Sequence, residues 1–482
     1  MKKPAKRVLL ISAVAGVFLA MVFGFYLWKA ALVVTGFEAK NLCSDVFVSG
    51  RTPAAVSSED LLPVGALYPL RFANGRIDYG KRTVTASIHG LAERKAIFRQ
   101  GLGCTLMIGG GKSIDWSAEG ATVAARDAHG RENEPWPRGE MVDTKHLPHV
   151  LDGQKLRQAV DWAFREPDPD HLRGTRELVV VYDGRIVAER YAPGFSSHTP
   201  LPGWSMTKSV FAALAGILVG EGKLSLQSDA LLPEWCKAHD PRKKITLNDL
   251  LHMCSGLAFQ ENYSSPLSDV SAMMFGTGDM ASFAANKPLL FRPGVKWQYS
   301  SGTPNIVSEV MRNVFGNERE YIEFPRRELF ERIDMKSAVV EPDASGTLVG
   351  SAFMYATARD WARFGLLYMR DGMWGKDRIL PEGWVKYCTA PAPASGKRYG
   401  AGFWLRIPRE FRSGGKTVRA VPRGSYHAIG YDGQFVSVIP SLKLVVVRLG
   451  LTTTYGTWDQ EELISRIAGA VRSQGVESEP HS

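Results

Sequence analysis

The strongest hydrophobic pattern in the chain lies close to its first residue. From Val8 to Trp28, 21 consecutive residues carry no charged side chain, and most of them are apolar. As an α-helix this segment is about 30 Å long, which matches the hydrocarbon core of a bilayer. Residues 2–7 carry four positive charges, and such a flank stays in the cytoplasm. We therefore expect a basic flank and one transmembrane helix within residues 1–36.

This apolar segment could be an uncleaved signal anchor or a cleaved signal peptide. A cleaved peptide has an apolar stretch of roughly 7–15 residues and then a small-residue site of the A-x-A type. Here the apolar run is longer, and no clean site follows it. Cys43 follows Lys40, Asn41 and Leu42, which is not a lipoprotein signal. We favour the anchor, and with it a single-pass protein of the bacterial inner membrane whose remaining residues face the periplasm.

Residues 37–150 have the pattern of short strands separated by turns. Arg82–Ile88 has a strand-like composition, and glycines follow it at positions 101, 103 and 109–111. Residues 127–145 are charged and contain proline, as linkers often do. We expect a strand-rich N-terminal region here, with the next domain beginning in a helix near Asp152.

A hairpin and two later strands enclose the rest of the chain. Four segments have the pattern of strands: Glu177–Tyr182, Arg185–Arg190, Phe435–Ile439 and Leu444–Leu449. Asp183-Gly184 between the first two is among the strongest sequence signals of a hairpin. The chain between the two pairs is mainly helical in pattern to about residue 385. This order predicts one antiparallel sheet with a helical insertion, in a domain over residues 151–475.

Composition and charge change this picture little. The chain of 482 residues has 45% apolar and 22% charged residues, which is ordinary for globular proteins and excludes a wholly disordered chain. The 59 basic and 49 acidic residues leave a net charge of +10. Four of these charges belong to the N-terminal flank, so a solvated basic surface fits the remainder better than nucleic-acid binding.

The candidate chemistry begins with the spacing Ser-x-x-Lys, which occurs twice. At Ser413–Lys416 the two central residues are glycines, which disfavour a helix. Ser205 and Lys208 instead open an apolar run that reaches Val219. At a helix start, positions i and i+3 share a face, so a desolvated amine can take the proton of the hydroxyl. By this spacing alone, Ser205 could also be a helix cap and Lys208 a solvated residue.

Five segments resemble motifs of the serine β-lactamase-like, penicillin-recognising hydrolases of the class C-like type, in that family's order. They are Trp204–Ser209, Ile245–Leu251 with Cys254–Leu257, Pro293-Gly294 with Trp297–Gly302, Arg359–Gly365, and Gly430–Gln434. Together they cover about residues 170–470. Within the family, the chain most resembles the 6-aminohexanoate-dimer hydrolase-like branch, whose relatives often carry segments similar to Ala39–Ser44 and Gly101–Cys104.

The resemblance implies an α+β (α/β sandwich) fold of the β-lactamase/transpeptidase type. In that fold an antiparallel sheet is flanked by helices and carries a helical subdomain. The resemblance also supports a disulfide between Cys43 and Cys104, which both lie in the N-terminal region of a chain whose export would permit disulfides. Cys236, Cys254 and Cys388 would then be free thiols, although spacing alone does not fix the connectivity.

The resemblance also assigns catalytic roles. Lys208 would deprotonate the hydroxyl of Ser205, and Ser205 would then carry the acyl group. Tyr299, with a pKa lowered by the lysine ammonium, would pass the proton to the leaving group. Tyr263-Ser264-Ser265 has the same letters as Tyr299-Ser300-Ser301, but Tyr299 follows Pro293-Gly294 as in the family. The oxyanion hole would consist of the backbone N–H groups of Ser205 and Tyr431.

Three further residues are candidates for substrate binding. Tyr263 lies in a segment similar to the loop from which amide hydrolases of this branch place a tyrosine on the substrate, although it could also be an ordinary loop aromatic. The family's third motif, Lys-Thr-Gly or His-x-Gly, falls on Ala428–Gly430, where position 428 carries no cation. His427 and Gly430 are the remaining candidates, with a structural role as the alternative for the histidine.

We therefore expect an exported, membrane-anchored serine hydrolase that cleaves small amide or ester bonds without a metal or cofactor. Its partners would be a small-molecule substrate and the inner membrane, not nucleic acid. A β-lactamase or D,D-peptidase is the first alternative, and an inactive binding module on the same fold is the second. Gly109–Ser113 lacks the upstream glycine of a P-loop, and His146 and His149 lack the H-E-x-x-H frame, so neither predicts a ligand site.

Overall fold

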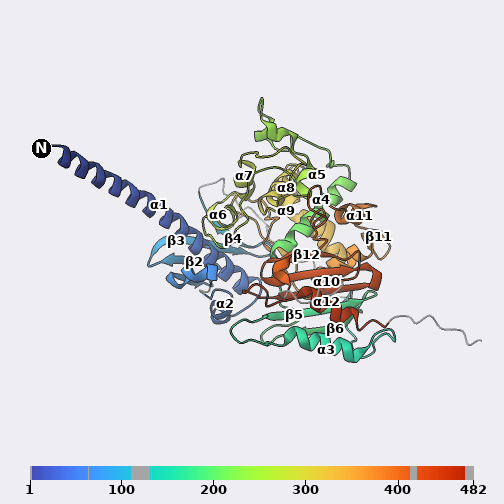
Figure 1. Ribbon diagram of the computed structural model, residues 1–482. Coiled ribbons are helices and arrows are strands. Elements are labelled where there is room, and N and C mark those ends of the chain that lie inside the picture. Colours follow the sequence, from blue (N-terminus) through green and yellow to red (C-terminus); the bar gives the residue numbers. More distant parts are fainter. Residues whose placement is uncertain (1–2, 63–64, 110–130, 132, 413–420, 473–482) are drawn as a thin grey trace, which may run out of the picture.

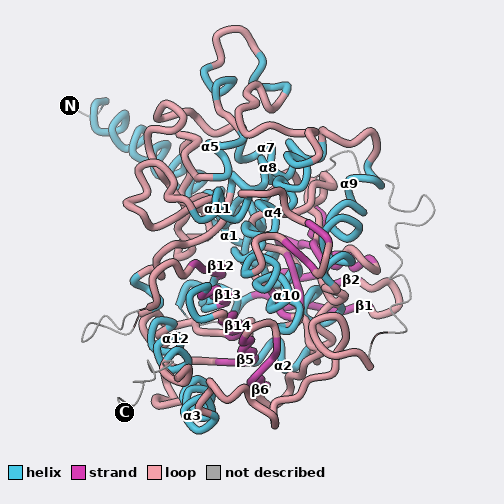
Figure 2. The backbone as a smooth tube through the Cα atoms, turned by 90° about the vertical axis from the view of Figure 1, so that its right-hand side faces the viewer, coloured by secondary structure: helices cyan, strands magenta, loops and turns pink. Residues whose placement is uncertain are grey.

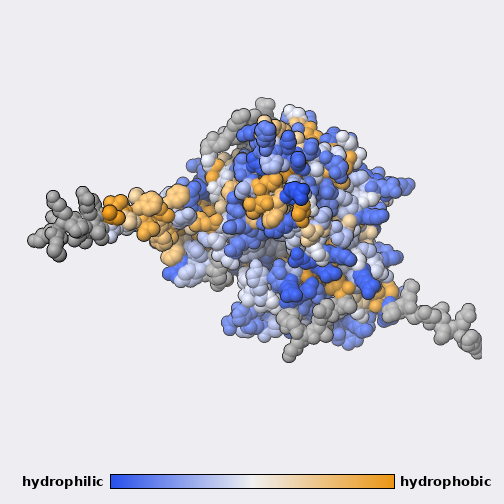
Figure 3. All heavy atoms as spheres, turned by 45° about the horizontal axis from the view of Figure 1, so that its top comes forward, coloured by the Kyte–Doolittle hydropathy of each residue, from blue (hydrophilic) through white to orange (hydrophobic). Residues whose placement is uncertain are grey.

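A computed structural model of the protein describes residues 3–62, 65–109, 131, 133–412 and 421–472. Its first element, α1 (Lys3–Phe47), is one helix of 45 residues whose first half projects from the body (Figure 1). The large apolar side chains between Ile11 and Trp28 are exposed, and they form a hydrophobic rod in Figure 3. Within the described part of the chain, it is the one helix long and apolar enough to cross a bilayer.

The second half of α1 is part of the folded body. From Val33 onward the helix is largely buried, and its apolar residues join the main hydrophobic core. The helix therefore continues past residue 36, where the hydrophobic pattern suggested an end. Packing supplies the reason, since a helix gains most of its stability from the face that it buries. Gly36 lets α1 approach its neighbour closely, because a Cβ atom there would lie 2.4 Å from the carbonyl oxygen of Phe275.

A four-stranded antiparallel sheet packs against this half of α1. Its strands, in spatial order, are β1 (Ala73–Asp78), β2 (Thr83–Ile88), β3 (Leu91–Arg99) and β4 (Gly103–Met107). Two short helices precede it, α2 (Pro53–Glu59) and the 3-10 helix η1 (Gly65–Phe72). A disulfide joins Cys43 on α1 to Cys104 on β4, with 6.1 Å between the Cα atoms. It is the pair that the family resemblance suggested.

A buried ion pair ties this N-terminal unit to the larger domain. Lys40 on α1 is paired with Glu341, and their side chains are 1% and 0% exposed. Ser44 Oγ donates to the same carboxylate at 2.9 Å, and so does the backbone N–H of Cys104 at 2.6 Å. Burial raises the pKa of Glu341, while the ammonium of Lys40 opposes the rise. The contact therefore fixes both α1 and β4 against the larger domain.

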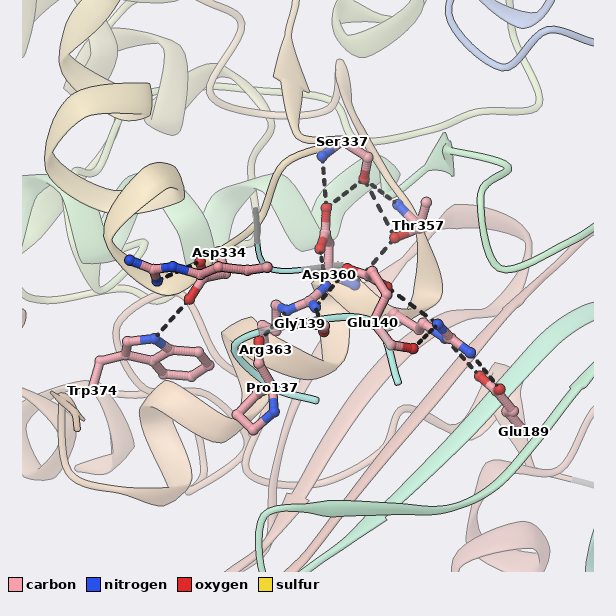
Figure 4. Close-up of polar contacts among 12 residues, drawn as sticks. Pro137, Gly139, Glu140, Glu189, Asp334, Ser337, Thr357, Asp360, Arg363 and Trp374 are labelled. Atoms are coloured by element: carbon pink, nitrogen blue, oxygen red, sulfur yellow. Dashed lines mark hydrogen bonds and ion pairs between the residues drawn. The ribbon is translucent and has the colours of Figure 1, made fainter. Parts of the chain in front are cut away.

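Residues 127–145 were expected to form a linker, but the part of this segment that the structure describes is bound to the larger domain by hydrogen bonds and ion pairs. Arg363 is 1% exposed at its side chain and donates to the carbonyl oxygens of Pro137 and Gly139 at 2.9 and 2.7 Å (Figure 4). It also pairs with the Glu140 carboxylate at 2.7 Å, and Arg359 contacts the same carboxylate. These bonds dock the segment on α10 (Ala358–Met369), so its charged residues serve tertiary contacts rather than a free linker.

The larger domain is built around the predicted antiparallel sheet. The hairpin is confirmed as β5 (Thr175–Tyr182) and β6 (Arg185–Tyr191). The three later strands are β12 (Tyr426–Gly430), β13 (Gln434–Ile439) and β14 (Leu444–Gly450). The spatial order is β12-β13-β14-β5-β6, so the last strand of the chain pairs with the first strand of the hairpin (Figure 2). In the register of that pairing, Val447 of β14 lies opposite Val179 of β5.

Helices cover both faces of this sheet. One face packs on α3 (Gly153–Phe164) and α12 (Gln460–Ala468), and the other packs on α4 (Thr207–Gly220) and α10. The inserted residues form a mainly helical subdomain on the side of α4 (Figure 1). Its helices are α5 (Leu247–Leu251), α6 (Asp269–Gly276), α7 (Met280–Ala285), α8 (Gly302–Arg312), α9 (Glu318–Pro325) and α11 (Trp384–Thr389). The short strands are β7 (Leu201–Pro202), β8 (Val339–Val340), β9 (Met354–Ala356), β10 (Met373–Trp374) and β11 (Asp377–Arg378).

Candidate active site

The structure brings Ser205 and Lys208 together at the start of α4. Ser205 lies in a single 3-10 turn, η2 (Trp204–Met206), which leads directly into the helix. Lys208 follows one turn later, and its Nζ donates to Ser205 Oγ at 2.8 Å. Because α4 is almost entirely apolar after Lys208, the helix is buried and carries the amine into the interior, where it is 3% exposed.

The environment of Lys208 suits a base. Burial lowers the pKa of its ammonium to about 8, against the opposing charge of the Glu261 carboxylate. Two further acceptors orient the amine, Ser301 Oγ at 3.1 Å and the carbonyl oxygen of Ser351 at 2.9 Å. An amine with such a pKa is deprotonated often enough near neutral pH to accept the hydroxyl proton of Ser205.

The backbone around the nucleophile is tightly constrained. Trp204 has a φ of 47°, a left-handed conformation that is rare for a bulky residue and marks strain just before Ser205. Gly430 at the end of β12 faces this turn, and a Cβ atom there would lie 2.2 Å from the carbonyl oxygen of Gly203. Gly430 therefore permits the close approach of strand and nucleophile. Tyr431, proposed for the oxyanion hole, is the next residue, and its ring lies 5.8 Å from that of Trp204.

Tyr299 also lies at the site. Its ring centroid is 4.9 Å from Lys208 Nζ, and the neighbouring side chains of Ser205 and Trp404 each act to lower its pKa. The expectation of a lowered pKa is wrong. Burial raises the pKa of Tyr299, and the negative charge of Glu261 raises it further. The phenol therefore stays neutral and can donate a hydrogen bond or a proton, but it is not a phenolate base.

Glu261 is a site residue that sequence reasoning passed over. Its carboxylate accepts hydrogen bonds from the backbone N–H of Ser301 at 2.7 Å, from the Ser301 hydroxyl, and from the Tyr263 hydroxyl at 2.6 Å. A continuous chain of polar contacts therefore runs from Tyr263 through Glu261 and Ser301 to Lys208. The sequence held a partial signal, since Ser301 is the third residue of the Tyr-Ser-Ser motif and Glu261 precedes Tyr263 by two positions.

Tyr263 forms part of an aromatic wall beside the nucleophile. Its ring lies 4.9 Å from the ring of Tyr431, which in turn contacts Trp204. The three residues line one side of an apolar pocket. Burial raises the pKa of both tyrosines, so their phenols are neutral. This position is compatible with the substrate contact expected for Tyr263.

His427 lies on the other face of the sheet. Side chains alternate along a strand, so His427 points away from the face that Ala428 and Gly430 share. It is 1% exposed, with Nδ1 2.9 Å from Ser437 Oγ, and Ser437 also accepts from Gln460 on α12. Burial lowers the pKa of His427 to about 3, so the ring is neutral. We therefore assign it a structural role and correct its candidacy as a substrate contact.

The structure describes only some of the other sequence candidates. Ser413–Lys416 and residues 110–113 of the P-loop-like segment lie outside the described residues. His146 is exposed and contacts Asp143 at 2.8 Å. In the described ranges no cluster of three or more histidine, cysteine, aspartate or glutamate residues could hold a metal ion. Cys236, Cys254 and Cys388 are free thiols there.

Comparisons with known proteins agree with this geometry. The sequence profile of a family described as Beta-lactamase matches residues 165–471. A 6-aminohexanoate-dimer hydrolase from Paenarthrobacter ureafaciens is 23% identical over 287 residues, which are 57% of this chain and 72% of that protein. Protein Rv1367c from Mycobacterium tuberculosis is 37% identical over 114 residues, or 20% of this chain and 28% of that protein. EstCE1, described as a hydrolase with promiscuous acyltransferase activity, has a TM-score of 0.51 at 16% identity, covering 66% of this chain and 98% of that chain.

Proposed function

The chain belongs to the beta-lactamase family, and from this premise we propose that it is an exported, membrane-anchored serine hydrolase. It cleaves an amide or ester bond through an acyl-enzyme on Ser205. The observation that carries the proposal is the 2.8 Å contact between Ser205 Oγ and the buried amine of Lys208, whose pKa is lowered to about 8. The relative from Paenarthrobacter ureafaciens, which is named a 6-aminohexanoate-dimer hydrolase, supports the reaction class.

The reaction follows from the positions of the three side chains. Lys208 takes the proton from Ser205 as the oxygen attacks the substrate carbonyl, and a bond forms between Oγ and the carbonyl carbon. The negative charge moves to the carbonyl oxygen, where the backbone N–H groups of Ser205 and Tyr431 would hold it. The bond to the leaving group then breaks, and Tyr299 relays the proton that the departing alcohol or amine needs. Water repeats these steps on the acyl-enzyme and releases the acid.

Anchoring is the second part of the proposal. The exposed apolar helix from Ile11 to Trp28 and the positive flank before it support a single crossing with the catalytic domain in the periplasm. The disulfide between Cys43 and Cys104 supports the same location, since disulfides persist in oxidising compartments.

Two alternatives are less well supported. A β-lactamase or D,D-peptidase holds the substrate carboxylate with a cation in the third motif, but position 428 is a buried alanine on the site's face. An inactive binding module would not need the contacts of Lys208 with Ser205 and Ser301.

Intact-mass spectrometry tests the reaction directly. The full-length protein is incubated separately with a fluorophosphonate, p-nitrophenyl butanoate and nitrocefin. We expect a covalent fluorophosphonate adduct on Ser205 and faster turnover of the ester than of the cephalosporin. Turnover of nitrocefin well above that of the ester would favour the β-lactamase alternative. The absence of both adduct and turnover would favour the binding module.

A further inference from the structure

The apolar pocket is lined both by Trp204, the residue before the nucleophile, and by residues of α1. The space between its lining residues, with the open solvent at its mouth counted in, is about 650 Å³. Trp204, the residue before Ser205, lines the pocket together with Tyr263 and Tyr431, and Val33 of α1 lines it as well. The aromatic wall is thus shared between the catalytic site and the pocket. A substrate with its carbonyl at Ser205 can extend an apolar substituent along these rings.

The pocket is built partly from α1 and partly from the catalytic domain. Val34 and Phe37 of α1 line it, and Met274 and Phe275 of α6 complete that side. The rings of Phe37 and Phe275 meet edge to face at 5.0 Å. The helix that bears the apolar N-terminal segment therefore also contributes to substrate space.

This arrangement places the pocket near the membrane surface. Val33 and Phe37 follow the last residue of the uncharged run, Trp28, by five and nine positions. At 1.5 Å per residue, they lie about 8 to 14 Å beyond the hydrocarbon core along the helix. The headgroup layer on one side of a bilayer is about 5 to 8 Å thick. The pocket wall therefore begins close to the outer boundary of the headgroups.

The surface next to the pocket fits the same surroundings. The 3-10 helix η1 lines the pocket with Leu70 and exposes Tyr68 and Phe72, which are 53% and 47% accessible. Arg71 lies between them, with its guanidinium 4.6 and 4.7 Å from the two ring centroids. Aromatic rings and cations are the side chains that favour the lipid–water boundary.

We propose that the substrate is an amphiphile whose unbranched aliphatic chain occupies this pocket and enters it from the membrane surface. The ester or amide carbonyl of that amphiphile meets Ser205, where the oxygen forms a bond to the carbonyl carbon. The leaving alcohol or amine departs with a proton, and water later releases the acid. This inference rests on the proposed serine hydrolase function and specifies its substrate class.

Chain length provides the first test. Full-length protein in detergent is assayed with p-nitrophenyl butanoate and dodecanoate, and with butyl and dodecyl butanoate, so that the long chain lies once on the acyl side and once on the alcohol side. Each methylene buried in an apolar pocket strengthens binding severalfold. We expect kcat/KM to rise at least about tenfold from the short to the long chain in one of the two series. Equal or lower values for the long chain in both series overturn the proposal.

A pair of tryptophan variants locates the effect. Ser271 of α6 is the small polar residue on the pocket wall, and Ser271→Trp would fill the space. Ala272→Trp adds the same bulk at the next position of α6, which does not line the pocket. We expect Ser271→Trp to abolish the preference for the long chain over butanoate, while Ala272→Trp keeps that preference. Retention of the preference in Ser271→Trp places the chain elsewhere and overturns the proposal.

A third comparison separates a lipid from a soluble amphiphile. The long-chain ester is presented to vesicle-reconstituted protein either dissolved in the same phospholipid bilayer or as a monomer in solution. Faster turnover from the bilayer supports entry from the membrane, and equal or faster turnover from solution overturns it.

Labelling of Ser205 by a short-chain fluorophosphonate is measured in parallel. Loss of labelling would indicate failure of the proposed hydrolase function, whereas labelling without a chain preference would reject this inference alone.

Discussion

At the scale of single residues, the proposed reaction depends on one hydroxyl, one amine and one phenol that pass protons between them. Ser205→Ala should abolish turnover and covalent labelling, and Lys208→Ala should cost nearly as much, because the hydroxyl then has no base. Tyr299→Phe should lower the rate about 10²- to 10⁴-fold, the usual worth of one positioned proton donor. Since the three act as a unit, their losses should not add. Burst kinetics with a chromogenic ester measure each variant, and loss of activity in Ser413→Ala but not in Ser205→Ala would refute the assignment.

Glu261 permits a test of charge. Its carboxylate raises the pKa of Lys208, so it opposes the lowering caused by burial. The reaction needs the neutral amine, so activity should rise with pH through the pKa of Lys208. Glu261→Gln removes the negative charge, which lowers that pKa and should move the rising limb of the kcat/KM profile to lower pH. Tyr263→Phe removes a hydrogen bond to Glu261 without changing its charge and should leave the limb in place. A shift of the Glu261→Gln limb to higher pH would contradict this account.

At the scale of elements, the buried pair of Lys40 and Glu341 fastens α1 to the larger domain. Removing one partner leaves the other unpaired in the interior, and such changes cost about 3–5 kcal/mol. Glu341→Gln and Lys40→Met should each lower the unfolding temperature strongly. The double variant should cost clearly less than the sum of the two, because neither charge is left alone. Thermal unfolding in detergent measures all three proteins, and additive losses would show that the pair does not act as a unit.

At the scale of the whole molecule, the exposed half of α1 should hold the protein in the membrane. Full-length protein should sediment with membranes, remain there in high salt, and dissolve in detergent. An uncharged apolar helix binds a bilayer far more tightly than basic charge alone, which salt screens. N-terminal sequencing of the membrane fraction should find residues before Val8. A mature chain that begins beyond Trp28 would instead show a cleaved signal peptide.

The sequence by itself determined what depends on short spacing. Four features are local patterns whose outcome local geometry fixes: the i, i+3 placement of Ser205 and Lys208, the Asp-Gly hairpin, the apolar strand segments and the long apolar segment near the N-terminus. The family motifs added the order in which distant segments meet.

Only the tertiary structure decided the features that depend on long-range packing. Ser301 reaches Lys208 across 93 residues, and Glu261 joins them from a separate loop. The raised pKa of Tyr299 follows from burial and from that nearby carboxylate, neither of which its sequence context reveals. The contribution of α1 to the apolar pocket has the same origin, because which surfaces a helix covers depends on the elements that the fold brings against it.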